Sequence, residues 1–140
     1  MEAVLLLALG IGSVSGLRVF TSLAALALVR GGVWSYVVAV IALGEYVADA
    51  SPNIPSRTAL PSIAIRPLSG AVAGWLIAAM HGGSTVLAAV GAVCGVIGAF
   101  AGTYGGHAAR LWAIARIGAI PAALAEDVLA IALAAFLVTR

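Results

Sequence analysis

Charge is scarce in this sequence, and so are lysine and cysteine. Among 140 residues there are seven arginines, no lysine, five acidic residues and one cysteine, so that charged residues make up 9% of the chain. An ordinary soluble domain carries about 25% charged residues. A disulfide scaffold needs paired cysteines, and the arginines are scattered singly instead of forming the basic patch of a nucleic-acid-binding protein. These shortages exclude all three classes, and we expect no nucleic-acid partner.

Apolar residues are what the sequence has in abundance. Hydrophobic residues make up 64% of the chain, which also excludes disorder, because disordered chains combine low hydrophobicity with high net charge. We therefore predict an integral membrane protein in which residues 1–140 form a single transmembrane domain and the lipid bilayer is the main partner.

Clusters of glycine, proline and arginine divide the apolar sequence into five segments. A spanning helix needs about 20 mostly apolar residues, and we expect such helices over about 3–29, 33–50, 68–80, 84–113 and 122–138. Four of the five prolines lie in 51–67, which predicts an ordered or partly re-entrant loop there. The third helix starts at Ile63 instead if Arg66 and Pro67 lie within the bilayer. The predicted fold class is all-α, a polytopic helical membrane protein with about five transmembrane helices and a proline-rich loop after the second.

Arginines near the predicted helix ends indicate the orientation. Five crossings place Arg57, Arg66 and Arg116 on the side of the N-terminus, and Arg30 and Arg140 on the other side. The excess of basic residues on the cytoplasmic side of membrane proteins then predicts a cytoplasmic N-terminus and an exported C-terminus. Dual insertion is the alternative, because the excess is small.

Arg18 lies near the middle of the first predicted helix. A central arginine costs about 2.5–3.5 kcal/mol to insert and usually faces a partner or a water-filled cavity. Segment 10–16, just before it, is rich in glycine and serine, which allows a bend or a broken helix that aims backbone groups at a bound ion. The alternative is close helix packing through small residues.

Four acids lie within predicted helices. Glu45 and Asp49 are four residues apart and share one helix face, whereas Glu126 and Asp127 are adjacent and point about 100° apart. An ion or proton site is one interpretation, because carboxylates in a low dielectric exchange protons near neutral pH. The other is that the acids only neutralise the interior arginines in structural ion pairs. These arginines are Arg18, Arg66 and Arg110.

The fourth predicted helix carries a polar stripe formed by Thr103, His107 and Arg110, which we expect to face the acids. His107 could relay protons, or it could be an ordinary hydrogen-bonding residue. The other histidine, His81, is far along the chain, and no metal-ligand spacing occurs, so we predict no metal and no cofactor. No nucleotide-binding loop or nucleophile motif is present either, and we predict no catalytic residue and no enzyme activity.

Glycines recur every four residues in the same helix, at Gly91 and Gly95 and at Gly98 and Gly102. This spacing lets two helix backbones approach closely in lipid. The contact could lie within the chain or between copies. For so small a chain we expect a homo-oligomer formed through the glycine-rich helix 84–113.

The first and last pairs of predicted helices share a charge pattern, since Arg18 and Arg110 are each followed by acids in the next helix. With one helix between them, the two pairs run in opposite directions. Such a pattern is typical of transporters built from inverted repeats, whose sites lie near the bilayer midplane. It predicts an inverted repeat here, although the spacings within the two pairs differ.

Several short pieces, which follow one another in order along nearly the whole chain, carry a family resemblance. They are Gly16-Leu17-Arg18, Glu45 with Ala48-Asp49 and Pro52, Arg66-Pro67 with Gly70-Ala71, His107 with Arg110, and Pro121 with Glu126-Asp127. Together they resemble a bacterial family of small integral-membrane proteins catalogued as domain of unknown function 4126. The resemblance implies a location in the bacterial cytoplasmic membrane and importance for these polar positions, and it implies no activity.

The leading hypothesis is a small helical membrane transporter or channel-like protein with a buried arginine and carboxylate site for an ion, a proton or a small solute. The alternative is a non-transporting structural or lipid-interacting membrane protein. The residues predicted to bind the ligand or ion are Arg18, Glu45, Asp49, Arg66, His107, Arg110, Glu126 and Asp127.

Overall fold

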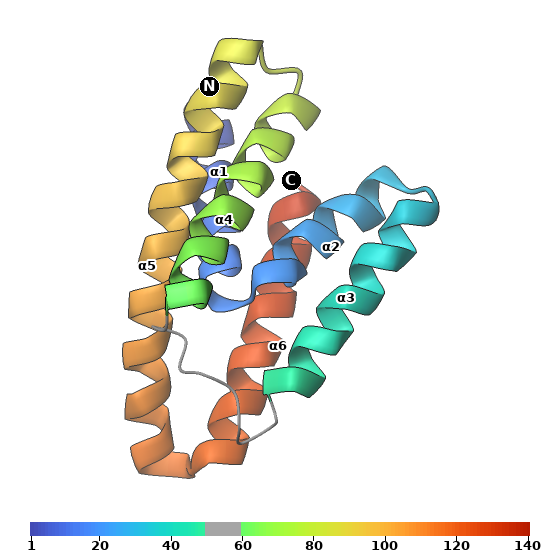
Figure 1. The fold of residues 1–140 in the computed structure, drawn as a ribbon. Helices are drawn as coiled ribbons and strands as arrows, with labels where there is room; N and C mark the ends of the chain where they lie inside the picture. The colour runs from blue at the N-terminus through green and yellow to red at the C-terminus, as the bar shows by residue number, and fades with distance from the viewer. Residues whose placement is uncertain (50–59) are drawn as a thin grey trace.

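The computed structural model describes residues 1–49 and 60–140, and it describes the side chains of all of these except 48, 49 and 60–62. Within this part of the chain all regular structure is α-helical, as predicted. The six helices are α1 (Glu2–Leu17), α2 (Val19–Arg30), α3 (Val33–Asp49), α4 (Leu60–Met80), α5 (Thr85–Ile117) and α6 (Ala119–Val138) (Figure 1).

Three of these helices are long and apolar enough to cross a bilayer. They are α4, through its apolar stretch Ile63–Met80, and the whole of α5 and α6. At a rise of 1.5 Å per residue α5 is about 50 Å long, which exceeds the roughly 30 Å of a hydrocarbon core. The other three helices are also apolar but shorter. These lengths and compositions support a helical membrane protein.

The first predicted helix is in fact two helices, and the chain reverses between them. α1 runs from the N-terminus to the middle of the molecule, where the extended residue Arg18 (φ −141°, ψ 117°) ends it. α2 then returns toward the end from which α1 came (Figure 1). The break thus lies just after the glycine- and serine-rich segment 10–16. In place of one continuous helix over 3–29, the structure has a helical hairpin, the α1–α2 hairpin, with its tip in the interior.

The proline-rich segment contains more helix than expected. α4 begins at Leu60 and includes Pro67, so the prediction of a loop is wrong for residues 60–67, while 51–59 lie outside the described residues. A membrane helix tolerates an internal proline where neighbouring groups satisfy the freed backbone carbonyl. Arg66 and Pro67 therefore belong to the helix, in agreement with the alternative start of the third helix at Ile63.

The boundaries of the last two helices differ slightly from the prediction. Ser84 caps α5 by accepting a hydrogen bond from the Leu87 amide at 3.3 Å. The helix continues beyond 113 to Ile117, and Gly118, with φ of 87°, turns the chain into α6. Pro121 lies in the first turn of α6, where its missing N–H has no helical partner to lose.

Glycines bring the backbones of α1, α4 and α5 close together. A Cβ atom at Gly95 would lie 2.0 Å from the carbonyl oxygen of Gly70 on α4, and a Cβ at Gly12 on α1 would lie 2.2 Å from the carbonyl oxygen of Gly95. Gly98 and Gly102 approach the α1 backbone in the same way. These glycines of α5 are therefore used within the chain, against α1 and α4. The homo-oligomer stays a prediction.

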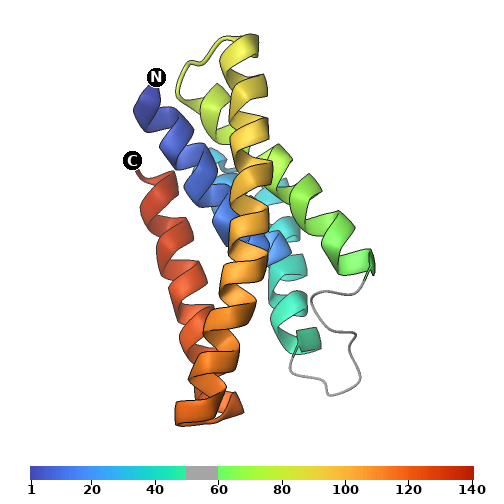
Figure 2. The same cartoon turned by 90° about the vertical axis from the view of Figure 1, so that its left-hand side faces the viewer.

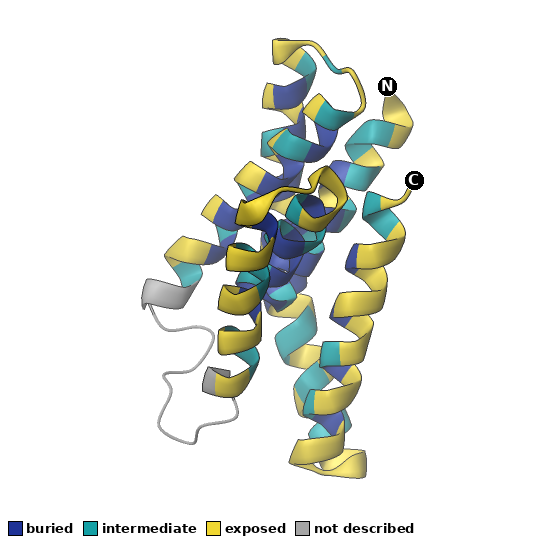
Figure 3. Ribbon diagram, turned by 90° about the vertical axis from the view of Figure 1, so that its right-hand side faces the viewer, coloured by how far each residue is buried: buried dark blue, intermediate teal, exposed yellow. Residues whose placement is uncertain are grey.

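The buried hydrophobic core lies where the α1–α2 hairpin packs against α4 and α6. Its residues are Ala8, Ile11, Val14, Leu26, Ala73, Ile77 and Ala134. Figure 3 shows the buried positions gathered in the middle of the molecule and exposed positions along the outward faces of α3 and α6. Large apolar side chains such as Trp34, Val40 and Val128 lie on those faces, as expected for surfaces that contact lipid.

Both chain termini lie toward the same end of the molecule (Figures 1 and 2). We call this the terminal end, and we call the opposite end, where Gly118 connects α5 to α6, the Gly118 end. The sequence argument for orientation placed Arg30 and Arg140 opposite the N-terminus, but α2 and the chain itself end on the same side as the N-terminus. Arg66 is buried, so it belongs to neither end. The arginine count assumed five crossings. Because the chain reverses at Arg18, Arg30 and Arg140 do not lie opposite the N-terminus, and that count no longer supports an orientation.

Candidate functional site

The reversal at Arg18 leaves two helix ends in the middle of the protein. The last carbonyls of α1 and the first amides of α2 have no hydrogen-bond partner within their own helices. In an apolar interior each unsatisfied backbone group is costly. The tip of the α1–α2 hairpin therefore requires polar groups from other helices.

Glu45 on α3 closes the N-terminal end of α2. Its carboxylate oxygens accept hydrogen bonds from the backbone amides of Val19 at 2.8 Å and Phe20 at 2.9 Å. The negative charge also interacts favourably with the partial positive charge of a helix N-terminus. In this structure Glu45, which the sequence predicted as an ion- or ligand-binding acid, acts as a helix cap.

Arg66 on α4 closes the C-terminal end of α1. Its guanidinium donates hydrogen bonds to the carbonyl oxygens of Gly16 and Leu17, the second at 3.2 Å. The Thr103 hydroxyl on α5 also lies 3.3 Å from the Gly16 carbonyl oxygen. A positive charge is favourable at a helix C-terminus for the same reason that a negative charge is favourable at the N-terminus. The two ends of the break thus receive opposite charges from two different helices.

Arg18 itself pairs with Asp127 on α6. The Arg18 side chain is almost completely buried, whereas the Asp127 side chain is 21% exposed. The guanidinium carbon of Arg18 also lies 4.7 Å from the centre of the Tyr46 ring on α3, which is within the range of a cation–π interaction. The Tyr46 hydroxyl oxygen is 2.8 Å from that of Thr21 on α2. Arg18 therefore connects the tip of the hairpin to both α3 and α6.

The neighbouring acid on α6, Glu126, faces a different arginine. Its carboxylate accepts a hydrogen bond from Arg110 on α5 at 3.4 Å. Glu126 is nearly buried, while the Arg110 side chain is 24% exposed. Adjacent residues on a helix point about 100° apart, so one turn of α6 presents carboxylates to arginines on two sides. The structure thus pairs two of the predicted interior arginines with two of the predicted acids, and the sequence had left open which arginine pairs with which acid.

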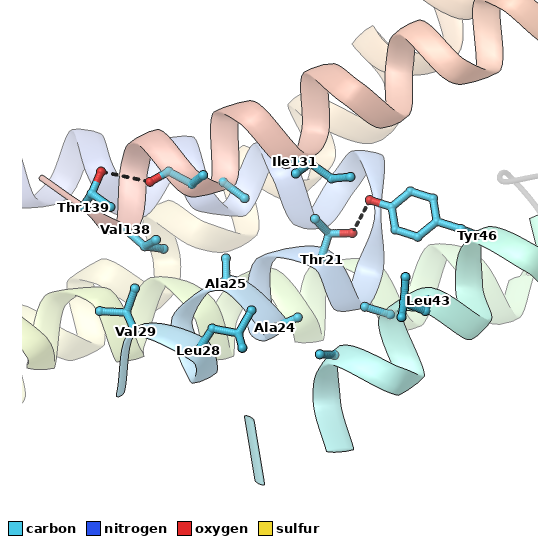
Figure 4. A pocket seen from close by; sticks show the side chains of 14 residues that line it. Thr21, Ala24, Ala25, Leu28, Val29, Leu43, Tyr46, Ile131, Val138 and Thr139 are labelled. Atoms are coloured by element: carbon cyan, nitrogen blue, oxygen red, sulfur yellow. Dashed lines mark hydrogen bonds between the residues drawn. The ribbon is translucent and has the colours of Figure 1, made fainter. Parts of the chain in front are cut away.

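An apolar pocket lies on the side of α6 that faces α2 and α3, and we call it the terminal-end pocket. It has a volume of about 440 Å³. Its lining runs from Thr21 and Tyr46 at the inner end to Val29 and Thr139 near the terminal end (Figure 4). Tyr46, which lines the inner end of this pocket, contacts Arg18 of the Arg18–Asp127 pair.

A second apolar pocket lies on the side of α6 that faces α1 and α5, and we call it the Gly118-end pocket. Its volume is about 510 Å³, and its lining runs from Ser13 and Leu17 near the hairpin tip to Ala113 and Ala122 near Gly118. Arg110 and Glu126 are its charged lining residues. The two pockets therefore extend from the middle of the molecule toward opposite ends, and each is associated with one of the two ion pairs.

For two predicted site residues, Asp49 and His107, the described part of the structure shows no contact with these ion pairs. Asp49 ends α3, but its side chain is outside the described part of the structure. His107 is half-buried on α5, and among the described residues the structure gives it no hydrogen bond or ion pair. Thr103, which we expected to face the acids, instead contacts the backbone of α1 and its own helix, through Gly16 and Ala99.

Three polar residues that form hydrogen bonds near the tip of the α1–α2 hairpin were not identified from the sequence. They are Thr21, Tyr46 and Ser69, whose hydroxyl donates to the Val19 carbonyl oxygen at 2.6 Å. Tyr46 directly follows Glu45, and Ser69 lies three residues after Arg66, which places both beside a predicted site residue on the same helix. Their closeness along the chain to Glu45 and Arg66 was the feature of the sequence that could have identified Tyr46 and Ser69.

No protein-family model matches the chain, and comparisons with curated proteins and with solved structures give no match.

Proposed function

We propose that the protein is a small helical membrane transporter or channel-like protein for an ion, a proton or a small solute, in which Glu126 and Asp127 exchange protons. The supporting observation is the position of these two acids on one turn of α6. They contact Arg110 and Arg18 on two sides of the helix, and the adjoining pockets extend toward opposite ends of the molecule. A proton that passes between the two acids would move between regions open to opposite sides of a membrane.

The arrangement in the membrane follows from the same topology. We place α3, α4, α5 and α6 as crossings, and the α1–α2 hairpin as a re-entrant element that enters from the terminal end, instead of five crossings. Non-helical backbone at membrane depth is tolerated where protein surrounds it, and Glu45 and Arg66 provide such surroundings for the break at Arg18.

Several finer predictions belong to this proposal. We propose the bacterial cytoplasmic membrane as the location, a cytoplasmic N-terminus, homo-oligomers, and membership of the resembled family of unknown function. The orientation now rests on Arg30 and Arg140 at the terminal end against Arg116 at the Gly118 end. The inverted repeat stays a prediction, and it gains no support from the pairing of Arg18, in the first helix pair, with Asp127 in the last.

Proton flux into liposomes tests the role of the acids. Vesicles that contain the purified protein and a pH-sensitive dye receive an external acid pulse, with potassium and valinomycin present to balance charge. We expect faster internal acidification than in protein-free vesicles, and a return to the protein-free rate in Glu126→Gln and in Asp127→Asn. The matched control is Glu2→Gln, because Glu2 is exposed at the start of α1. Unchanged flux in both interior variants would contradict the proposal.

A non-transporting structural or lipid-interacting role is the alternative, and one observation favours it. Glu45 and Arg66 satisfy the backbone of the hairpin tip directly, so at least part of the buried charge holds helices together. If this holds for all of the charges, Glu126→Gln and Asp127→Asn lower the stability in detergent, and the parent protein conducts no protons above the protein-free rate.

A further inference from the structure

The Gly118-end pocket combines an apolar wall with one arginine and one acid. Its volume of about 510 Å³ lies within the 300–1,000 Å³ range of small-molecule sites. Apart from Arg110 and Glu126, its lining consists mostly of alanine, glycine and leucine, together with Trp112 and Ser13. A ligand that fills it must therefore have an apolar body and at most a small charged group.

Arg110 has hydrogen-bonding capacity left over in this pocket. A guanidinium has five N–H donors, and among the described residues the structure gives Arg110 one hydrogen bond, to Glu126 at 3.4 Å. That distance is longer than the 2.7–2.9 Å of a strong charge-assisted pair. The side chain is also 24% exposed. Arg110 can therefore hold a second anionic group that enters the pocket.

The charge balance of the pocket selects a monoanion. One guanidinium compensates one negative charge, and a doubly charged phosphate beside Glu126 would leave excess negative charge in an apolar site. A carboxylate carries a single charge and matches the planar fork of an arginine with two parallel hydrogen bonds. The favoured ligand is thus an organic monocarboxylate with an apolar body.

Binding of a carboxylate beside Arg110 also has a consequence for Glu126. Two carboxylates with one guanidinium would carry a net charge of about −1 in the pocket, which like-charge repulsion disfavours. Among the described residues, the neighbouring arginine Arg18 does not relieve it, because Arg18 is paired with Asp127. His107 lies one turn before Arg110 on α5. The net charge of the pocket stays neutral if the ligand enters as the neutral acid. Its proton then passes to a Glu126 oxygen, and its carboxylate takes the place of the Glu126 carboxylate as the partner of Arg110.

We propose that the Gly118-end pocket binds a small amphiphilic monocarboxylate through Arg110 and takes up one proton on Glu126 for each molecule bound. This inference rests on the proposed function, because it gives that function a substrate class and a reason for the proton-exchanging acid. It predicts the coupled entry of an organic anion and a proton.

Calorimetric titration of the purified protein in a mild detergent tests the ligand class. The probes are 3-phenylpropionate, the matched neutral alcohol 3-phenylpropan-1-ol, and the dianion phenyl phosphate. We expect the carboxylate to bind about tenfold more tightly than the other two probes, because it alone adds charge-assisted hydrogen bonds without excess charge. Titrations in two buffers of different protonation enthalpy count the protons taken up, and we expect about one per carboxylate. Equal affinity for acid and alcohol, or carboxylate binding without proton uptake, would overturn the proposal.

Four variants assign the roles within the pocket. Arg110→Gln removes the preference for the carboxylate, whereas Glu126→Gln keeps carboxylate binding but takes up no proton. Gly105→Leu fills the pocket and abolishes binding, and it is expected to fold, because a Cβ at Gly105 meets nothing within 4 Å. Arg116→Gln is the matched control, since Arg116 stacks on Trp112 and does not line the pocket, and it leaves affinity and proton uptake unchanged. Retained carboxylate preference in both Arg110→Gln and Gly105→Leu contradicts the site.

The outcome is distinguishable from that of the flux assay. Carboxylate binding with proton uptake, but without proton flux in liposomes, supports this site and contradicts transport. Proton flux that depends on Glu126, without any preference for the carboxylate probe, supports transport and overturns this ligand class.

Discussion

The hydroxyl oxygens of Ser15 and Ser22 lie 2.6 Å apart although seven residues separate them in the chain. In a continuous helix seven residues advance about 10 Å along the axis, so this contact requires the chain to turn back. Ser15 belongs to α1 and Ser22 to α2, and Arg18 lies between them. The contact marks the narrow end of the α1–α2 hairpin, where both hydroxyls are buried.

A disulfide should therefore form between positions 15 and 22. In a Cys94→Ser background, Ser15→Cys with Ser22→Cys is expected to oxidise readily, because hydroxyl oxygens in contact place the two Cβ atoms near the separation that a disulfide needs. Protection from a thiol-reactive polyethylene glycol that is added after denaturation in sodium dodecyl sulfate, seen as the loss of a gel shift that reduction restores, measures the bond, because both positions are buried in the folded protein. Ser13→Cys with Ser22→Cys is the control and should stay reactive, because Ser13 donates to the Leu9 carbonyl instead. Full reactivity of both pairs would show that the chain continues straight through Arg18.

Removal of the Glu45 cap should destabilise the hairpin. Glu45→Ala deprives two buried amides of their acceptor, and hydrogen bonds to a charged group contribute about 1.5–3 kcal/mol each. We expect a loss of about 2–4 kcal/mol in the free energy of unfolding, measured by circular dichroism during titration with sodium dodecyl sulfate. Glu45→Gln should lose less, because one oxygen acceptor remains. Glu2→Gln should match the parent, and an equally small effect of Glu45→Ala would argue against the cap.

Two glycines of α5 should respond oppositely to alanine. At Gly95 a methyl group would lie 2.0 Å from the Gly70 carbonyl oxygen, so Gly95→Ala should cost about 1–3 kcal/mol through overpacking. At Gly105 a methyl group meets nothing within 4 Å, and Gly105→Ala should be neutral or stabilise by up to about 1 kcal/mol, because alanine favours helix. The same detergent titration compares them. Similar losses at both sites would mean that α5 does not pack closely on α4 at Gly95.

The two chain ends should be accessible from the same side of the membrane. Single cysteines in a Cys94→Ser background, introduced as Glu2→Cys, Arg140→Cys and Arg116→Cys, report their side through a maleimide that cannot cross membranes. We expect the first two to be labelled from one side of sealed vesicles and the third from the other, because the hairpin replaces one crossing. Labelling of Glu2→Cys and Arg140→Cys from opposite sides would restore the five crossings predicted from sequence.

Composition and spacing predicted the helical class, because apolar length acts locally. The small residues before Arg18 left a broken helix and close helix packing both open, and the segment itself was predicted as one helix over 3–29. Spacing also predicted that Glu126 and Asp127 point in different directions, since that follows from helix geometry alone. The reversal was not predictable in this way. A bend and a full return have the same local sequence, and the choice depends on Glu45 and Arg66, which lie far along the chain.

The roles of the individual charges were less accessible than their positions. Sequence identified Arg66 as an interior charge and offered acids as its partners, and it did not predict the hydrogen bonds of Arg66 to backbone carbonyls of α1. Such a partner carries no sequence signal of its own. The helical start of α4 before Pro67 was only an alternative prediction from the sequence, because proline breaks helices in water but is tolerated within a membrane helix whose neighbours satisfy the freed backbone groups.

The hairpin tip also fixes the order in which the protein can be completed during synthesis. Val19 is hydrogen-bonded to a residue that is made 26 positions later, and Arg18 is paired with one made 109 positions later. α1 and α2 must therefore remain unfinished until α3, α4 and finally α6 have left the ribosome. The first helices to be made are the last to reach their final hydrogen bonds, so a chain truncated before Asp127 would carry Arg18 without this ion pair.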